Sequence, residues 1–367
     1  MSIKERFINC FILGSIGDAF GQPIRNMNYE EIIKVYGEQG KTEFLGNDSD
    51  IGLITDVTQM SLFTAEGLLW AKSRIDKIGA CNIASRCFYS YQRWLHTQGY
   101  DLGDEAYSWV LCDERLEVKT NLLKDSRMYK KRTYTETCIR ALSETINQDY
   151  GTLESPINSN RGNEGVMRVA PVALCFSSSP RGAFDIGTQI AVITNSHPTA
   201  YLSAGALCAV LSYIMHGTPL ETAINATVNL LGRFAGSDAT SESMKLAVSL
   251  YKQGKPSMVL MKQLGKGVYA NEALAIALYS ALHYPNDFMK ALQLATNHDG
   301  DSSCTGAICG CLCGVMDESQ LAGEFRVDCK ELVLDMANRI YEVFCEHRDK
   351  RLEEKVFREV AASKVSH

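Results

Sequence analysis

Long hydrophobic runs are missing from this chain of 367 residues. No stretch of 18 or more consecutive apolar residues occurs, so we expect no membrane-spanning helix and no membrane partner. Four residues interrupt the N-terminal apolar run (Asn9, Gly14, Gly17 and Asp18), which favours a first core helix over a signal peptide. The net charge is −6 and there is no basic stripe, so we expect no nucleic-acid partner.

Clean strand-like alternation is also missing, and proline occurs only 8 times. Apolar residues instead recur at helical spacing, for example over residues 185–194, 201–216, 220–234 and 270–283. Glycine follows helical stretches at positions 79, 99, 217 and 254, where it commonly ends a helix. We therefore predict an all-α fold, a single compact orthogonal multi-helix domain over residues 1–367 with a central ligand cleft formed by helix N-termini and loops.

No internal repeat and no Ser/Gly/Pro-rich linker divides the chain. Residues 99–159 are the exception to the helical pattern, because they are polar and irregular. Within them, residues 113–132 are predicted to form a surface excursion that carries basic side chains.

The 13 cysteines are odd in number and scattered through apolar stretches, which does not resemble a disulfide framework. Cys304, Cys309, Cys311 and Cys313 lie close together in CTGAICGCLCG, a cluster that raises the question of zinc. Two of the spacings are i,i+2, which places side chains on different faces of a helix. We interpret these residues as small buried thiols in a packed helix. A reducing, cytoplasmic location follows as an expectation.

Five segments place polar groups at expected loop-to-helix junctions within apolar surroundings. They are GSIGDAFGQPIRN (14–26), ITDVTQM (54–60), RGNEGVMRVAP (161–171), TNSHPTAYLSAGA (194–206) and NHDGDSSCTGAICG (297–310). Helix N-termini carry unpaired N–H groups and suit phosphate or carboxylate. Glycine-rich junctions let a phosphorylated ligand approach the backbone. The segments together predict one cleft lined by helix starts, with Asp56, Asp299 and Asp301 inside it.

Each of these residues also has a structural interpretation. Thr55 and Asp56 have the residue types that begin a helix, and Asp18 is able to form a cap within a glycine-rich corner. His197 precedes a proline and fits a turn, while His298 fits a hydrogen-bonded loop. It is the occurrence of all five segments in one chain that favours function.

The combination resembles the ADP-ribosylglycohydrolase family, which removes ADP-ribose from modified proteins. The resemblance rests on GSIGDAFGQP, TDVTQMSLFTAEGLL, GVMRVAPVAL, SHPTAYLSAGAL, NEALAIALYSAL and HDGDSSCTGAICG, in the family's order and approximate spacing. Only residues 99–159 lack an obvious match. The resemblance implies an all-α fold with a central cleft that holds two magnesium ions against the ribose diol.

The sequence departs from the family pattern at the metal motifs. The family has Thr-Asp-Asp-Thr where this chain has Thr55, Asp56, Val57 and Thr58. In the second motif Gly300, Asp301 and Ser302 match, but Ser303 and Cys304 replace an acid and a hydroxyl ligand. Arg25 stands where a further acid often occurs, and Glu164 replaces a ligand-facing glycine.

Charge predicts the consequence for magnesium. A complete site sets roughly −5 from carboxylates against +4 from two ions, whereas Asp56, Asp301 and Arg25 leave roughly −1. Asp299 precedes Asp301 and is the one candidate replacement, because the thiol of Cys304 is a poor magnesium ligand. We expect at most one weakly held ion, with Thr55, Asp56 and Asp301 as its ligands.

The matches and the departures together suggest the remaining site residues. Asp56, Asp301 and Glu164 are the catalytic candidates, with Asp56 or Asp301 forming a carboxylate pair with Glu164. Arg25 is expected to bind pyrophosphate directly, because its planar fork suits phosphate oxygens. The ligand-binding candidates are Asp18, Arg25, Asn163, Met167, Arg168, His197, Gly267, Tyr269, His298, Asp299, Ser302 and Cys304.

Three functions remain open from the sequence. The first is a degenerate family member that recognises ADP-ribose or an ADP-ribosylated protein without the family's metal chemistry. The second is an active ADP-ribosyl-protein hydrolase that uses one metal or none, through the carboxylate pair or through Cys304 at a helix start, where a thiol pKa can fall. The third is a non-catalytic protein that binds and antagonises an ADP-ribosyltransferase.

Overall fold

The computed structural model describes residues 1–44, 51–103, 105–113, 120–132, 136–146, 149–316 and 326–346. In these ranges the regular elements are helices, and no strand is formed. The α-helices are α1 (Ile3–Gly21), α2 (Tyr29–Tyr36), α3 (Asp56–Ile78), α4 (Ile83–Thr97), α6 (Glu136–Glu144), α7 (Ala170–Cys175), α8 (Pro180–Val192), α9 (Pro198–Met215), α10 (Leu220–Leu231), α11 (Asp238–Tyr251), α12 (Met258–Met261), α13 (Ala270–His283), α14 (Phe288–Thr296), α15 (Ser302–Met316) and α16 (Lys330–Tyr341). The predicted all-α class is confirmed.

Short helical turns connect several of these helices. The 3₁₀ turns are η1 (Gln22–Ile24), η2 (Glu105–Leu111), η3 (Leu122–Lys124), η4 (Ser126–Tyr129), η5 (Val166–Arg168) and η6 (Lys262–Leu264), and the π-helical turn η8 (Glu342–Glu346) follows α16.

The predicted helices match the structure closely. The pattern over 270–283 coincides with α13, and those over 201–216 and 220–234 correspond to α9 and α10. Gly79, Gly99, Gly217 and Gly254 all have positive φ, the backbone conformation in which glycine commonly ends a helix.

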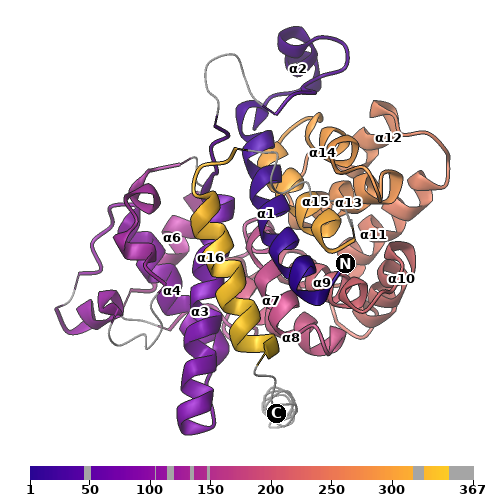
Figure 1. Cartoon of the computed structure of the whole chain (residues 1–367). Coiled ribbons are helices and arrows are strands. Elements are labelled where there is room, and N and C mark those ends of the chain that lie inside the picture. The colour runs from indigo at the N-terminus through magenta and orange to yellow at the C-terminus, as the bar shows by residue number, and fades with distance from the viewer. Residues whose placement is uncertain are drawn as a thin grey trace.

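Helices α1 and α15 lie antiparallel and side by side at the centre of the molecule, with α16 beside α1 (Figure 1). Glycines line the contact: a Cβ on Gly17 would lie 2.0 Å from the carbonyl oxygen of Gly306. A Cβ on Gly310 would lie equally close, at 2.0 Å, to the carbonyl oxygen of Leu13. Glycine is therefore needed here so that two backbones can touch. This corrects the expectation that these glycines admit a phosphorylated ligand.

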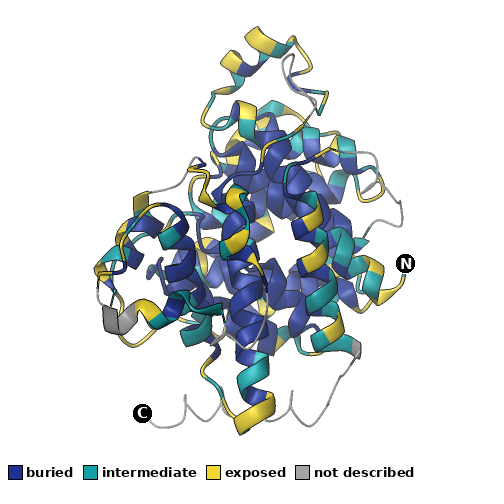
Figure 2. Ribbon diagram, turned by 60° about the vertical axis from the view of Figure 1, so that its left-hand side comes forward, coloured by how far each residue is buried: buried dark blue, intermediate teal, exposed yellow. Residues whose placement is uncertain are grey.

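The buried side chains form one hydrophobic cluster, which the exposed residues surround (Figure 2). By length and composition alone α9 would pass for a membrane-spanning helix, with a mean hydropathy of 1.4, yet 83% of it is buried inside the protein. Helix α2 lies at one end of the molecule, away from the main body, and buries only Ile32 (Figures 1 and 2).

The predicted surface excursion over residues 113–132 exposes Lys124, Lys130 and Lys131 in the part that the structure describes, residues 113 and 120–132. Two apolar side chains anchor this part to the protein interior. Leu122 and Met128 are fully buried in the core. Arg93 of α4 donates to the Glu66 carboxylate of α3 at 2.9 Å and to Asp113 at 2.6 Å. This buried charge network ties the segment to α3 and α4, a long-range contact that local composition does not reveal.

The 13 cysteines all fall within the described residues and are free thiols. Cys304, Cys309, Cys311 and Cys313 are buried in α15, as the interpretation of their spacing predicted.

Candidate ligand cavity

A polar cavity of about 500 Å³ lies where the chain after α1, the start of α15 and the segment 159–164 meet. Its volume is within the range of small-molecule sites. It is lined by Arg25, Asn26, Glu136, Thr137, Ser159, Asn160, Arg161, Gly162, Asn163, Glu164, Val268, Tyr269 and Asp301.

Arg25 is the cation at the floor of this cavity. Its Nη1 donates to Asp56 Oδ1 at 2.8 Å. Its Nε lies 3.1 Å from Asp301 Oδ1, and its Nη2 donates to Asp301 Oδ2 at 3.2 Å. The guanidinium therefore joins the first residue of α3 to the residue that precedes α15. Asp56 and Asp301 both contact the Arg25 side chain, so segments 54–60 and 297–310 converge as predicted.

Burial and neighbouring charges shift the pKa values of Asp56 and Arg25. Burial raises the pKa of Asp56 to about 7, although the neighbouring Arg25 guanidinium opposes the shift. For Arg25, burial favours the neutral form, but the charges of Asp301 and Asp56 outweigh it and raise its pKa above the usual range. Arg25 is thus a permanent cation, and Asp56 is the group that gains or loses a proton near neutral pH.

Asp18 is fully buried and holds the first turn of α3. Its Oδ1 accepts from Thr55 Oγ1 at 2.6 Å, and its Oδ2 accepts from Thr58 Oγ1 at 2.6 Å. Oδ2 also accepts from the backbone N–H groups of Thr55 and Thr58, at 2.8 and 3.2 Å. Burial raises the pKa of Asp18 although these hydrogen bonds oppose the shift. Asp18 is not among the cavity-lining residues, so its predicted ligand contact gives way to a helix-capping role.

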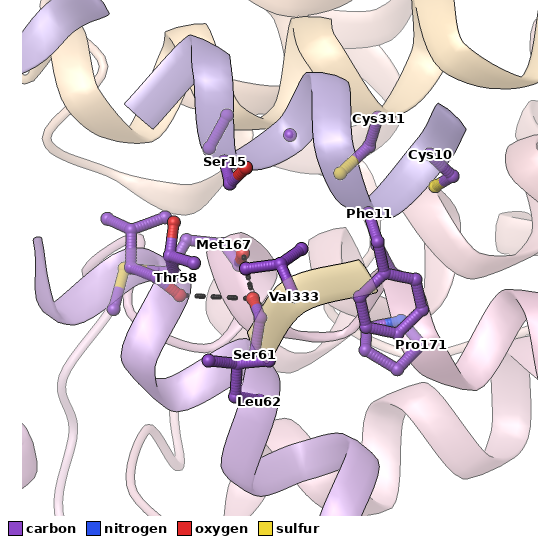
Figure 3. A pocket seen from close by; sticks show the side chains of 14 residues that line it. Cys10, Phe11, Ser15, Thr58, Ser61, Leu62, Met167, Pro171, Cys311 and Val333 are labelled. Atoms are coloured by element: carbon purple, nitrogen blue, oxygen red, sulfur yellow. Dashed lines mark hydrogen bonds between the residues drawn. The ribbon is translucent and has the colours of Figure 1, made fainter. Parts of the chain in front are cut away.

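The motif residue Val57 points away from the polar cavity. It lines a second, small apolar cavity of about 30 Å³ between α1, α3, α15 and α16. Figure 3 shows this space with Phe11, Met167 and Cys311 around it. The Ser61 hydroxyl lies 3.0 Å from the Val57 carbonyl oxygen and 3.4 Å from that of Met167. Met167, predicted to bind ligand, therefore belongs to the apolar interior instead.

Asn163 and the turn at Gly267 form the next part of the polar wall. Asn163 Nδ2 donates to the Gly267 carbonyl at 2.7 Å and to Asp301 Oδ2 at 3.0 Å, which fixes the Asp301 carboxylate from a second side. Tyr269 lies at the rim, where the Arg161 guanidinium stacks on its ring at 3.8 Å. Arg161 carries the second guanidinium of the lining.

Glu164 contributes a carboxylate to the cavity and is only 5% exposed. Its Oε2 accepts from Asn195 Nδ2 at 2.7 Å. A Cβ at position 162 would lie 2.2 Å from this oxygen, so Gly162 leaves the room that the carboxylate occupies.

The residues around the start of α15 mostly stabilise the loop before it. Ser302 donates to the Thr296 carbonyl at 2.7 Å, and His298 Nε2 lies 2.9 Å from Thr305 Oγ1. Burial lowers the pKa of His298, which favours the neutral ring. Asp299 Oδ1 accepts from the backbone N–H of Tyr29, the first residue of α2, at 2.7 Å. None of these three residues (Ser302, His298 and Asp299) lines the cavity.

Cys304 is fully buried, and burial raises the pKa of its thiol well above the usual range. The neighbouring Asp301 carboxylate raises this pKa further, so both effects oppose the lowering considered for a thiol at a helix start. A thiol that stays protonated and buried is unsuited to act as a nucleophile.

Arg168 and His197 are also displaced from their predicted ligand roles. Arg168 is fully buried in the core, with its guanidinium over the Tyr91 ring at 4.2 Å. His197 caps α9 by accepting from the Thr199 N–H at 3.1 Å. Neither side chain lines the cavity.

Some lining residues were missed from the sequence. Arg161 is the first residue of the segment 161–171 and Asn160 directly precedes it, so the proximity of Asn163 was a usable signal. Glu136 and Thr137 had no such signal, because they fall in the range 99–159 and reach the cavity only through the tertiary fold.

The side chains do not fit a pair of magnesium ions. Both Thr55 and Thr58 hydroxyls donate to Asp18, and Ser303 donates to the Asp18 carbonyl at 3.3 Å. The Asp56 and Asp301 carboxylates are bonded to a guanidinium. Across the described ranges, no group of three or more His, Cys, Asp or Glu residues is arranged to hold a metal ion. Magnesium is usually held through one or two carboxylates, with water completing about six ligands, and here the Asp56 and Asp301 carboxylates are already bonded to Arg25.

Comparison with known proteins places these features in context. The model of the ADP-ribosylglycohydrolase family matches residues 1–350. An uncharacterized protein of Archaeoglobus fulgidus is 22% identical over 93% of this chain and 97% of its own length. The ADP-ribosyl-[dinitrogen reductase] glycohydrolase of Rhodospirillum rubrum is 24% identical over 85% of this chain and 86% of its own. A solved ADP-ribosylglycohydrolase-related protein complex shares the fold, with a TM-score of 0.60 and 20% identity over 93% of this chain and 98% of that one.

Proposed function

The chain belongs to the ADP-ribosylglycohydrolase family, and we propose that it binds ADP-ribose, free or attached to a protein, with Arg25 in place of the family's metal cations. The observation that carries this proposal is the guanidinium held between Asp56 and Asp301, the two acids that remain from the metal motifs.

Electrostatics support the substitution. A guanidinium supplies a fixed positive charge and several N–H donors in one plane, which suits carboxylate and phosphate oxygens. Without it, two buried carboxylates would face the cavity and repel a pyrophosphate. With it, the net charge of Asp56, Asp301 and Arg25 is roughly −1 instead of roughly −2, so the repulsion is weaker. A ribose diol is then able to lie against Arg25, Asp301 and Asn163 without a bridging metal ion.

The rest of the cavity supports a nucleotide-sugar ligand. A volume of about 500 Å³ suits a ligand of this size, and the walls carry carboxylate, amide and guanidinium groups. The Arg161 guanidinium at the rim adds a cation for a pyrophosphate, and the Tyr269 ring beneath it is suited to stacking.

Magnesium has a minor role in this proposal. At most one ion binds, weakly, because Asp56 and Asp301 would have to release Arg25 first. The Val57 side chain faces apolar surroundings and offers no oxygen.

Calorimetric titration with ADP-ribose tests the proposal. In EDTA the wild-type protein should bind, and added magnesium should leave the affinity unchanged. Arg25→Glu should weaken binding by about 1.5–3 kcal/mol, the contribution of a charge-assisted hydrogen bond, because it replaces the cation with a third acid. Arg25→Lys is the matched control, since it keeps the charge and loses only the planar fork. Affinity that depends on magnesium, or that is equal in the wild type and Arg25→Glu, would refute the proposal.

Metal-independent hydrolysis of ADP-ribosylated protein is the second candidate. It is favoured by one observation, that Glu164 and Asp301 both line the cavity as carboxylates. One would act as a general acid and the other would position a water molecule. Rapid cleavage in EDTA that Glu164→Gln abolishes, with ADP-ribose binding retained, would favour this function over binding alone.

A further inference from the structure

Arg168 is a fully buried guanidinium without an adjacent carboxylate. In the described part of the chain, no Asp or Glu oxygen is found within ion-pair distance of it. It contacts the Tyr91 ring, the sulfur atoms of Met60 and Cys138, the Ile190 carbonyl and the Thr194 hydroxyl. A buried charge normally has a compensating partner, so the route from Arg168 to the nearest acid is informative.

Three hydrogen bonds lead from Arg168 to Glu164. Arg168 Nη2 donates to Thr194 Oγ1 at 2.7 Å, and Thr194 Oγ1 donates to Asn195 Oδ1 at 2.7 Å. Asn195 Nδ2 then donates to Glu164 Oε2 at 2.7 Å. Every donor points the same way, from the guanidinium toward the carboxylate. A series of hydrogen bonds whose donors all point the same way is polarised by the charges at its ends, and each bond strengthens its neighbours.

The four residues that these three hydrogen bonds join are all at least nine-tenths buried. Arg168, Thr194 and Asn195 are 0% exposed, and Glu164 is 5% exposed. Asn195 is held further by a second bond, from its Nδ2 to Asn160 Oδ1 at 2.9 Å. The last acceptor, Glu164, lines the cavity, and its Oε1 accepts no hydrogen bond from any residue that the structure describes. Asn195 thus fixes Oε2 of Glu164, and Oε1 is available to a ligand.

We propose that Arg168, Thr194 and Asn195 are positioning residues that hold Glu164 as an oriented acceptor for a hydroxyl group of the distal ribose of ADP-ribose. The inference rests on the proposed function, which places that ribose against Arg25, Asp301 and Asn163. A carboxylate with one oxygen fixed accepts a sugar hydroxyl without first reorganising, and so with less loss of conformational freedom.

Thr194 offers the sharpest test, because valine has the same shape and lacks only the hydroxyl. Calorimetry should compare ADP-ribose with ADP, which has no distal ribose, on the wild type, Thr194→Val and Thr194→Ser. Thr194→Val should weaken ADP-ribose binding about 3- to 10-fold, the effect of one hydrogen bond. It should leave ADP affinity unchanged. Thr194→Ser keeps a hydroxyl and should recover most of the loss.

The double variant Thr194→Val/Glu164→Gln separates positioning from general loss of stability. If Thr194 acts through Glu164, the double variant should bind ADP-ribose no more weakly than Glu164→Gln alone. Additive losses, equal losses for ADP and ADP-ribose, or a Thr194→Val affinity equal to wild type would each overturn the inference and leave the proposed function standing. Failure of the wild-type protein to bind ADP-ribose would overturn both.

Discussion

Arg25 and Arg168 are two buried guanidiniums in opposite situations. Arg25 contacts two carboxylates directly and faces the polar cavity. Arg168 contacts no carboxylate among the described residues and is surrounded by an aromatic ring, two sulfur atoms and a hydroxyl. The first arginine offsets the charge of two acids that it contacts. The second is joined to an acid of the same site only through the hydrogen bonds of Thr194 and Asn195. Burial alone therefore does not reveal what an arginine does.

Removal of Arg168 should have the largest effect on stability. Arg168→Met loses the bonds to Thr194 and to the Ile190 carbonyl and the contact with the Tyr91 ring, so we expect about 3–4 kcal/mol less unfolding free energy. Urea denaturation measures this. Arg140→Met is the control, because Arg140 is 74% exposed in its pair with Glu144 and should change stability little. Equal losses in the two variants would show that Arg168 has no special role in the core.

Removal of Arg25 should have a smaller effect that depends on pH. Arg25→Met leaves Asp56 and Asp301 facing one another, so at least one must take up a proton. A raised folded-state pKa gives stability that is fully present below the unfolded pKa and is lost as pH rises through the folded pKa. Relative to wild type, we expect a loss of about 2–3 kcal/mol at pH 8 and less than about 1 kcal/mol at pH 5.

Urea denaturation at both pH values measures the Arg25→Met effect. Arg25→Lys retains the charge and should behave more like the wild type at pH 8. A loss that is the same at pH 5 and pH 8 would contradict the assignment of Arg25 as the cation that offsets these two acids.

Asp56→Asn should have the smallest effect, a change in the slope of stability against pH. The pKa of Asp56 is raised to about 7, from an ordinary value of 3.8, so the wild type should lose stability as pH rises from about 4 through 7. Asparagine does not titrate, and we expect it to remove about 2 kcal/mol of the difference between pH 5 and pH 8. Asp76→Asn is the control, because Asp76 lies on the same helix with a side chain that is 51% exposed. This variant should leave the slope of stability against pH unchanged.

Much of the fold could be predicted from the sequence. Apolar residues at helical spacing predicted α13 at its observed bounds, because a buried helix face imposes that spacing locally. Positive φ at Gly79 and Gly217 followed from their positions after helical runs. The burial of Leu122 and Met128 could not be predicted, because the residues near them are polar and irregular and the core that covers them comes from other parts of the chain.

The candidate site was predicted in part. Arg25, Asn163, Glu164, Tyr269 and Asp301 line the cavity, as expected of ligand-facing residues. Asp18, Met167 and Arg168 were assigned to the ligand and instead support the structure around it. Their motifs identify segments near the cavity, but a motif does not state which side of a helix faces the ligand.

By itself the sequence determined the helical class, the segments that approach the cavity and the absence of carboxylates at Val57 and Ser303. Only the tertiary structure decided which partners the remaining charges have. Arg25 meets Asp56 across 31 positions and Asp301 across 276, while Thr55 and Thr58 use their hydroxyls on Asp18. Local residue patterns specify helices because helical hydrogen bonds join near neighbours. The partner of a buried charge depends on how distant helices pack together, and in this protein glycines let the backbones of α1 and α15 lie in contact.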